Sequence, residues 1–226
     1  RSYLINEGIP EDRIIKTGSP LFEVINSKKD DIDNSKVLER MNIKEKNYLV
    51  VSAHREENIS SEKNFRSLVD SLNTVAKKYS IPLVFSVHPR TRDMINKNNV
   101  RFNPLITLSK PLGFIDYVKL ELKAKAVLSD SGTINEESSI LGFPALNIRE
   151  THERPEAMQE AAVMMVGLKK DRILQGLQIL EKQENKILKV DDYNVPNVSE
   201  KVLRIIISYT DYVNKVVWRK PQSYLS

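Results

Sequence analysis

The segment AVLSDSGTINEE, residues 126–137, decides the fold of this chain. Its apolar start, Ala126 to Leu128, predicts a buried strand, and Gly132 permits a tight turn soon after it. Thr133 is a candidate N-cap and Glu136 follows three residues later, which is the spacing of a capping box. The segment therefore predicts a strand that ends in a tight turn and opens a helix.

The start of this predicted helix is a candidate phosphate site. The first N–H groups of a helix have no partner within it, and the helix dipole adds partial positive charge, so that together they bind phosphate. Glu137 lies one turn further on and could reach neutral hydroxyls, such as those of a ribose, while backbone amides hold the phosphates. A capped helix without a ligand is the alternative, because many such turns in α/β folds bind nothing.

The spacing of apolar residues predicts strands and helices that alternate along the chain. We expect strands at 14–16, 49–53, 82–87, 105–108, 126–129, 145–148 and 163–166, a charged loop at 28–34, and helices at 1–7, from 19, and at 62–79, 114–122, 133–141, 155–160, 171–182 and 199–218. The alternation is typical of βαβ units and predicts an α/β fold, a Rossmann-like parallel sheet with helices on both faces. One domain is the simplest count, although the helix from residue 199 is longer than such a domain requires.

The composition is that of an ordinary globular chain. The 226 residues are 40% hydrophobic and 29% charged with a net charge of +5, and no apolar run approaches the roughly 20 residues that span a bilayer. The charges are mixed along the chain, which argues against nucleic acid as a partner, whereas a mild positive balance suits a pyrophosphate ligand. The lack of cysteine excludes disulfides and thiolate chemistry, and with no signal-peptide pattern we expect a cytoplasmic protein without a membrane segment.

Polar residues collect directly after four of the predicted strands, where ligands bind in a doubly wound sheet. All three histidines lie there, at positions 54, 88 and 152, together with arginines at positions 55, 90, 92, 149 and 154. Each could be ordinary surface charge, but four polar loops at one edge favour a phosphate ligand, which arginine binds by paired hydrogen bonds. The histidine spacing does not fit a metal site, and the sequence lacks the Gly-x-Gly-x-x-Gly, Walker A and Gly-x-Ser-x-Gly patterns.

Together these motifs resemble the C-terminal half of the non-hydrolysing UDP-N-acetylglucosamine 2-epimerases. The matching stretches are SAHREEN (52–58), SVHP (86–89), PLGFIDY (111–117), SDSG (129–132) with Glu136 and Glu137, and ERPEA (153–157). They occur in the family's order and with its spacing over almost the whole chain. The tail, with YTDYV (209–213) and Val217-Trp218, is most similar to the capsule and O-antigen branch that makes UDP-N-acetyl-L-fucosamine.

The resemblance implies a two-domain glycosyltransferase-B-like fold, with residues 1–198 of this chain as the UDP-binding second domain. The first domain would be absent, in keeping with a chain that begins at Arg1 inside a predicted helix, and the helix of residues 199–226 would pack on it. The implied reaction inverts C2 of the sugar without a cofactor. UDP is eliminated to give a 2-acetamidoglycal and re-adds after the C2 proton is replaced on the opposite face. The implied partners are a UDP-sugar and a second copy of the chain in a homodimer.

The resemblance also implies roles for individual residues. His54 would be the catalytic residue that helps UDP to leave, while the proton-moving carboxylates would lie in the first domain. The residues implied to bind UDP are Ser131, Gly132 and Thr133 at the pyrophosphate, His88 and Arg154 along the phosphate region, Glu137 at the ribose, Tyr117 or else Phe114 at the uracil, and Arg55.

Three positions depart from the family pattern. Glu56 stands where a second arginine is usual, Thr133 where a second glycine is usual, and His152 where a threonine is usual. The missing arginine puts the allosteric UDP-GlcNAc site of some bacterial members in doubt, and His152 could reflect a different sugar. Two alternatives stay open: a UDP-sugar glycosyltransferase of the same fold, and a UDP-binding domain without chemistry.

Overall fold

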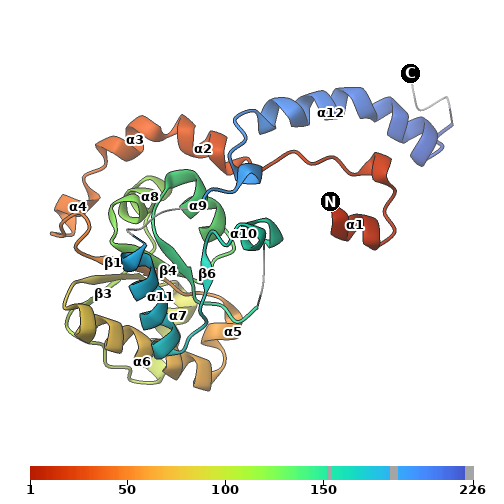
Figure 1. The fold of residues 1–226 in the computed structure, drawn as a ribbon. Helices are drawn as coiled ribbons and strands as arrows, with labels where there is room; N and C mark the ends of the chain where they lie inside the picture. The colour runs from red at the N-terminus through yellow and green to blue at the C-terminus, as the bar shows by residue number, and fades with distance from the viewer. Residues whose placement is uncertain (152–153, 184–187, 222–226) are drawn as a thin grey trace. The chain divides into compact units, whose positions relative to one another are not determined.

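A parallel sheet with helices on both faces forms the larger part of the chain in its computed structural model (Figure 1). The structure describes residues 1–151, 154–183 and 188–221. Within these ranges the sheet has the strand order β3-β2-β1-β4-β5-β6, and all of its pairs are parallel. This is the strand order of a Rossmann fold, so the predicted fold class is confirmed.

Each strand follows an apolar run in the sequence. The bounds are β1 Leu49–Ser52, β2 Leu83–Ser86, β3 Ile106–Ser109, β4 Ala126–Ser129, β5 Ala145–Asn147 and β6 Met164–Met165. Successive side chains point to opposite faces: Leu49 and Val51 belong to the core on one side of the sheet, and Val50 belongs to the core on the other. A parallel sheet that is covered on both faces requires such continuous apolar runs.

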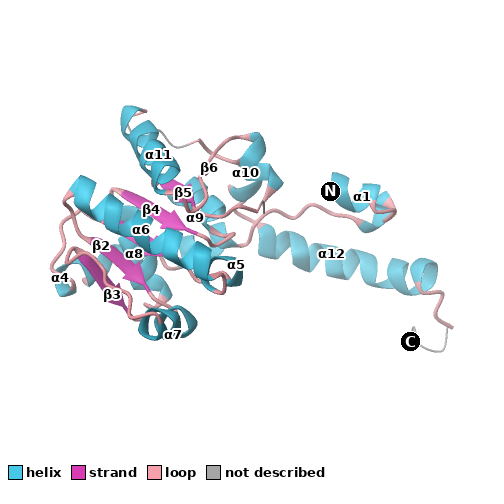
Figure 2. Cartoon of the chain, turned by 90° about the horizontal axis from the view of Figure 1, so that it is seen from below, coloured by secondary structure: helices cyan, strands magenta, loops and turns pink. Residues whose placement is uncertain are grey.

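Helices supply the other half of both cores (Figure 2). One face is covered by α6 (Glu62–Tyr79), α7 (Pro89–Lys97) and α11 (Lys170–Lys182), and the other by α4 (Val37–Arg40), α8 (Phe114–Lys123) and α9 (Ile134–Leu141). Gly176 lets α11 approach the sheet closely, because a Cβ atom at this position would lie 3.0 Å from both δ carbons of Leu146. The same unit contains α3 (Lys29–Asn34), α5 (Glu56–Ile59) and α10 (Pro155–Gln159).

The two ends of the chain form a second compact unit, Arg1–Ser27 with Asp191–Ser226, whereas the sheet unit is Lys28–Val190. Its elements are α1 (Ser2–Asn6), the 3-10 turns η1 (Glu11–Arg13) and η2 (Asp191–Tyr193), α2 (Leu21–Ser27), α12 (Val198–Tyr212) and the π-helical turn η3 (Val213–Val217). Within this unit Glu23 accepts hydrogen bonds from the backbone N and the hydroxyl of Ser199, at 3.0 and 3.1 Å. By its own contacts the chain thus divides at residues 27 and 190. None of the helices described here is long and apolar enough to cross a membrane.

Two local predictions were wrong. Residues 14–16 form no strand, and none of the described strands pairs with them. Residues 28–34 are not a loop, because Lys29–Asn34 forms α3. Ile32 is buried there and anchors an otherwise charged helix, whose Lys29 forms an ion pair with Asp33 one turn later.

Candidate functional site

The strands β1 to β5 end at residues that pair with one another across the sheet. Ser52 on β1 is in register with Ser86 on one side and with Ser129 on the other, and the register continues to Ser109 and Asn147. The loops after these strands therefore leave the sheet at the same height. The polar loops of the sequence do meet at one edge, which is where doubly wound folds bind ligands.

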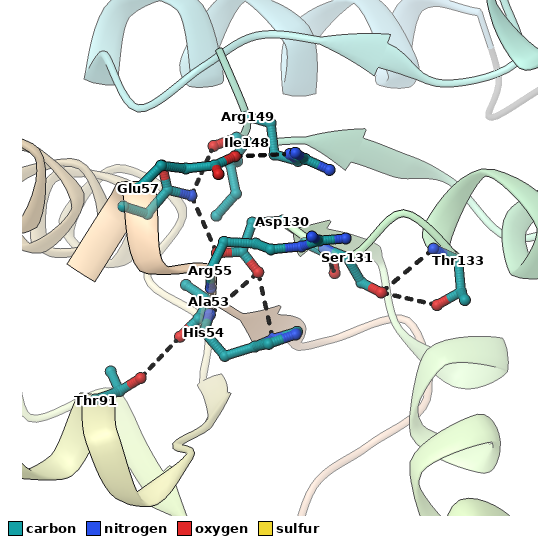
Figure 3. A network of polar contacts seen from close by, with 12 residues as sticks. Ala53, His54, Arg55, Glu57, Thr91, Asp130, Ser131, Thr133, Ile148 and Arg149 are labelled. Atoms are coloured by element: carbon teal, nitrogen blue, oxygen red, sulfur yellow. Dashed lines mark hydrogen bonds and ion pairs between the residues drawn. The ribbon is translucent and has the colours of Figure 1, made fainter. Parts of the chain in front are cut away.

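Asp130, the first residue after β4, is a buried carboxylate that holds the loop after β1 (Figure 3). It accepts hydrogen bonds from the backbone N of His54 at 3.0 Å, from the backbone N of Arg55 at 2.9 Å and from Nδ2 of Asn58 at 3.0 Å. Its Oδ1 also lies 3.3 Å from Nδ1 of His54. A carboxylate at this depth needs such donors to offset the loss of water. Because they come from one loop, Asp130 fixes both the backbone and the ring of His54.

Arg149 holds the same loop from the end of β5. This buried guanidinium donates through Nε to Oε1 of Glu57 at 3.0 Å and through Nη2 to Oγ1 of Thr151 at 3.0 Å. Thr151 in turn donates to Glu57 at 3.1 Å. On α7 the buried Thr91 donates to the carbonyl oxygen of Ala53 at 3.1 Å. Groups from three elements therefore hold the loop after β1 (Figure 3).

The turn before α9 has Thr133 at its N-cap position, as predicted, but lacks the side-chain hydrogen bond of a capping box. Thr133 already has helical backbone angles (φ −71°, ψ −17°), and its side chain caps no N–H group of the helix. Oγ of Ser131 instead accepts a hydrogen bond from Thr133 N at 3.3 Å and lies 2.8 Å from Thr133 Oγ1. Glu136 forms an ion pair with Arg154, in which Oε1 and Nη2 are 2.8 Å apart. The capping-box part of the prediction was therefore wrong, and Ser131 accepts a hydrogen bond from the backbone N–H of Thr133 itself.

The residues of this turn line a hollow of about 280 Å³. Its lining consists of Arg55, Ser131, Gly132, Thr133 and Arg154. Two guanidinium groups and the start of a helix give it positive potential, which suits a phosphate group. Arg154 directly precedes α10 and has a left-handed backbone (φ 72°), a conformation that is uncommon outside glycine and often marks a functional position.

Three titratable groups lie close together on α8 and α9: Glu121 is buried, and Tyr117 and Glu137 are half-buried. Burial raises the pKa of Glu137 to about 7, although the Thr133 hydroxyl favours its ionised form. Burial and then the charge of Glu137 raise the pKa of Glu121 well above its usual range. Burial and then Glu121 do the same for the pKa of Tyr117, one helical turn earlier. Within the described ranges no three His, Cys, Asp or Glu side chains are grouped as metal ligands would be.

The structure brings most of the predicted UDP-binding residues together. Arg55, Ser131, Gly132, Thr133 and Arg154 share the hollow, and Tyr117 and Glu137 interact electrostatically with each other. His88 precedes α7 with an exposed side chain and does not line the hollow, while His152 and Glu153 lie outside the described residues. Sequence reasoning missed Glu121, and it noted Arg149 as a post-strand arginine and Asp130 within SDSG without giving either a role in holding the loop. The signal for Asp130 was its place immediately after a buried strand.

Comparison with known proteins yields a consistent set of relatives. A family model described as UDP-N-acetylglucosamine 2-epimerase matches residues 1–207. The UDP-N-acetylglucosamine 2-epimerases of Methanocaldococcus jannaschii and Escherichia coli O157:H7 are 28% and 30% identical to the chain, each over 82% of it. The chain spans about half the length of these curated relatives, 53% and 51%.

Solved structures give the same result. A UDP-N-acetylglucosamine 2-epimerase from Rickettsia bellii superposes with a TM-score of 0.89 at 38% identity, over 97% of this chain and 60% of that one. The UDP-GlcNAc 2-epimerase of Neisseria meningitidis, solved bound to UDP-GlcNAc, superposes with a TM-score of 0.76 at 28% identity, over 92% and 58% of the two chains. The similarity extends through both compact units, since it covers nearly the whole chain.

Proposed function

The chain belongs to the UDP-N-acetylglucosamine 2-epimerase family, and we propose that it is the nucleotide-binding half of an enzyme that inverts C2 of a UDP-linked N-acetylhexosamine. The hollow lined by Arg55, Ser131 to Thr133 and Arg154 carries this proposal. It combines two arginines with the start of a helix at the carboxyl edge of a Rossmann sheet, the usual place for a nucleotide phosphate. The Neisseria meningitidis relative, whose structure holds UDP-GlcNAc, supports the same ligand class here.

The nucleoside would lie beside α8 and α9. Glu137 belongs to the first turn of α9, directly after the residues that line the hollow, and its carboxylate would accept hydrogen bonds from ribose hydroxyls there. Tyr117 interacts with Glu137 and offers an aromatic ring for the uracil. His88 would contribute only at the rim of the site, because its side chain is exposed and lies outside the lining of the hollow.

His54 would assist the departure of UDP. A charged imidazole beside the phosphate hollow can donate a hydrogen bond to the oxygen that takes up the bonding electrons when the bond to C1 breaks. In the reverse step the same nitrogen would hold UDP for re-addition to the 2-acetamidoglycal. The groups that remove and return the C2 proton would belong to a further domain, in agreement with relatives about twice as long as this chain.

A finer assignment concerns the sugar and the setting. We propose a UDP-linked hexosamine of bacterial capsule or surface polysaccharide as the substrate, supported by the likeness of the tail, residues 209–218, to that branch of the family. Glu56 and Thr133, where the family usually has arginine and glycine, support a substrate or regulation that differs from the common UDP-GlcNAc enzymes. The family resemblance further supports a cytoplasmic homodimer.

Two experiments test the proposal. Calorimetry should show that the chain binds UDP, and Arg154→Ala should weaken binding by about 1.5–3 kcal/mol, the usual loss for a charged hydrogen bond. The matched control is Arg66→Ala, which removes an exposed guanidinium paired with Glu62 on α6 and should leave the affinity unchanged. Unaltered UDP binding by the Arg154 variant would contradict the phosphate site.

The second experiment addresses the reaction. The full-length protein is incubated with UDP-N-acetylhexosamines in deuterium oxide, and C2 is examined by NMR. Deuterium at C2 together with the inverted epimer is the expected result, because the proton is replaced during elimination and re-addition. Transfer of the sugar to an acceptor without deuterium at C2 would identify a glycosyltransferase instead. UDP binding without any turnover would identify a binding domain.

A further inference from the structure

We propose that Asp130 is the positioning residue that orients His54 and determines which of its ring nitrogens carries the proton. This inference rests on the proposed function, which gives His54 a reaction to serve. The observation behind it is that one buried carboxylate, adjacent in the chain to Ser131, contacts both the backbone and the ring of His54. Figure 3 shows these contacts converging on Asp130.

The hydrogen bonds to Asp130 leave its carboxylate little freedom to turn. A carboxylate has about four acceptor positions. The backbone N–H groups of His54 and Arg55 and the side-chain amide of Asn58 donate to it, at 2.9–3.1 Å. The remaining donor near it is the imidazole, with Nδ1 at 3.3 Å from Oδ1. This contact is an ion-pair distance to the charged ring, and catalytic hydrogen bonds often align fully only when substrate binds.

The chemistry of this contact fixes the state of the ring. A carboxylate oxygen accepts and cannot donate, so Nδ1 of a neutral His54 carries the proton. Nε2 is then unprotonated in the neutral ring and becomes a donor in the charged ring. The His54 side chain is 42% exposed, which leaves Nε2 accessible to a ligand. In the proposed elimination the charged ring donates from Nε2 to the departing phosphate oxygen, and the Asp130 carboxylate stabilises that charge.

The same carboxylate ties His54 to the phosphate hollow. Arg55 donates its backbone N–H to Asp130 and also lines the hollow, and Ser131 follows Asp130 directly in the chain and lines the hollow too. Asp130 therefore sets the distance between the histidine and the phosphate groups. Thr91 holds the same loop through the carbonyl oxygen of Ala53, which makes it a suitable comparison.

The test compares Asp130→Asn with Thr91→Val in the full-length protein. Both variants keep the side-chain shape and both remove a buried hydrogen bond on the loop after β1. An asparagine has only one acceptor oxygen for four donors, so it cannot hold the backbone and the ring together. The measurements are nitrogen-15 NMR of labelled histidine rings, with His54→Asn to assign the signals, followed by kcat and UDP affinity.

The wild-type protein should show neutral His54 protonated at Nδ1. Asp130→Asn should lose this preference and lower kcat on the order of 100-fold, the low end of general acid–base effects, a larger factor than its effect on UDP affinity. Thr91→Val should keep both the tautomer and kcat.

A wild-type His54 protonated at Nε2 would overturn the inference even if Asp130→Asn failed to fold. Equal losses of kcat in the two variants would also overturn it, since Asp130 would then act only as a loop anchor. The NMR result decides the role of Asp130 even if the wild-type protein shows no epimerisation, so the two failures are distinguishable.

Discussion

Replacing Glu137 with glutamine should stabilise the protein above pH 7 while it weakens nucleoside binding. The pKa of this half-buried carboxyl is about 7 in the folded chain, whereas its ordinary value is 4.5. Between these values the folded state keeps a proton that the unfolded state releases, so stability falls as the pH rises. At 1.36 kcal/mol per pKa unit, this difference between the two pKa values lowers the free energy of unfolding by about 3 kcal/mol above pH 7.

Glutamine cannot ionise, so this cost disappears in the variant. Glu137→Gln should therefore be more stable than the wild type by up to about 3 kcal/mol at pH 8 and nearly equal to it at pH 4, in urea unfolding monitored by circular dichroism. Glu39→Gln is the matched control. That side chain is 72% exposed, so its replacement should leave the free energy of unfolding unchanged at both pH values.

Binding should change in the opposite direction. A ribose donates hydrogen bonds best to an ionised carboxylate, so the affinity of the wild type for uridine should rise about tenfold from pH 6 to pH 8. Uridine is used instead of UDP because a terminal phosphate titrates near pH 6 itself. Glu137→Gln should bind uridine weakly and equally at both pH values. Wild-type uridine affinity that does not change from pH 6 to pH 8, or a glutamine variant that is less stable at pH 8, would refute this reasoning.

Three further results are expected. His54→Asn should lower the kcat of the full-length enzyme far more than it lowers UDP affinity by calorimetry, and an equal effect on both would indicate a binding role. Ser131→Ala should weaken UDP but not uridine, because its hydroxyl lies at the phosphate hollow, and equal losses for the two ligands would argue against that placement. Gly176→Val should lower the free energy of unfolding by about 1–3 kcal/mol in urea unfolding, because side-chain atoms of Leu146 and Val166 would lie 3.0 and 3.1 Å from the new Cβ. Unchanged stability would show that α11 can move away from the sheet.

The sheet could be predicted because its signals are local. β1 and β4 consist of apolar runs bounded by polar turns, and the one-sided apolar pattern of α6 gave both ends of that helix correctly. The two segments that failed depend on distant partners. Residues 14–16 have strand-like composition but no neighbouring strand in the described chain, and α3 forms around one buried residue, Ile32. Local propensity is a weak guide where tertiary packing decides the outcome.

The location of the candidate site could be predicted, but the buried residues that hold its loops could not. The loops after the strands pointed to the right edge, because parallel strands end together. The sequence placed Asp130 and Arg149 after strands, and only the folded chain shows that both are buried and hold the loop with His54. The capping hydrogen bond of α9 was not predictable for a similar reason. Thr133 is the N-cap residue, but its backbone is already helical and its hydroxyl lies beside Ser131 instead of on an N–H group of the helix.

The aligned serines at the ends of β1 to β4 have a consequence for engineering. Ser52, Ser86, Ser109 and Ser129 are in register with one another, so the loops that follow them begin at the same level of the sheet. A loop from a relative that is joined at the serine leaves the pairing of the strands unchanged. Removing one residue inside a strand would instead reverse the inward and outward side chains from that point on. The loop after β1 is held by Asp130 and Thr91 from other parts of the chain, so its exchange has to keep the donors and the carbonyl that these residues bind.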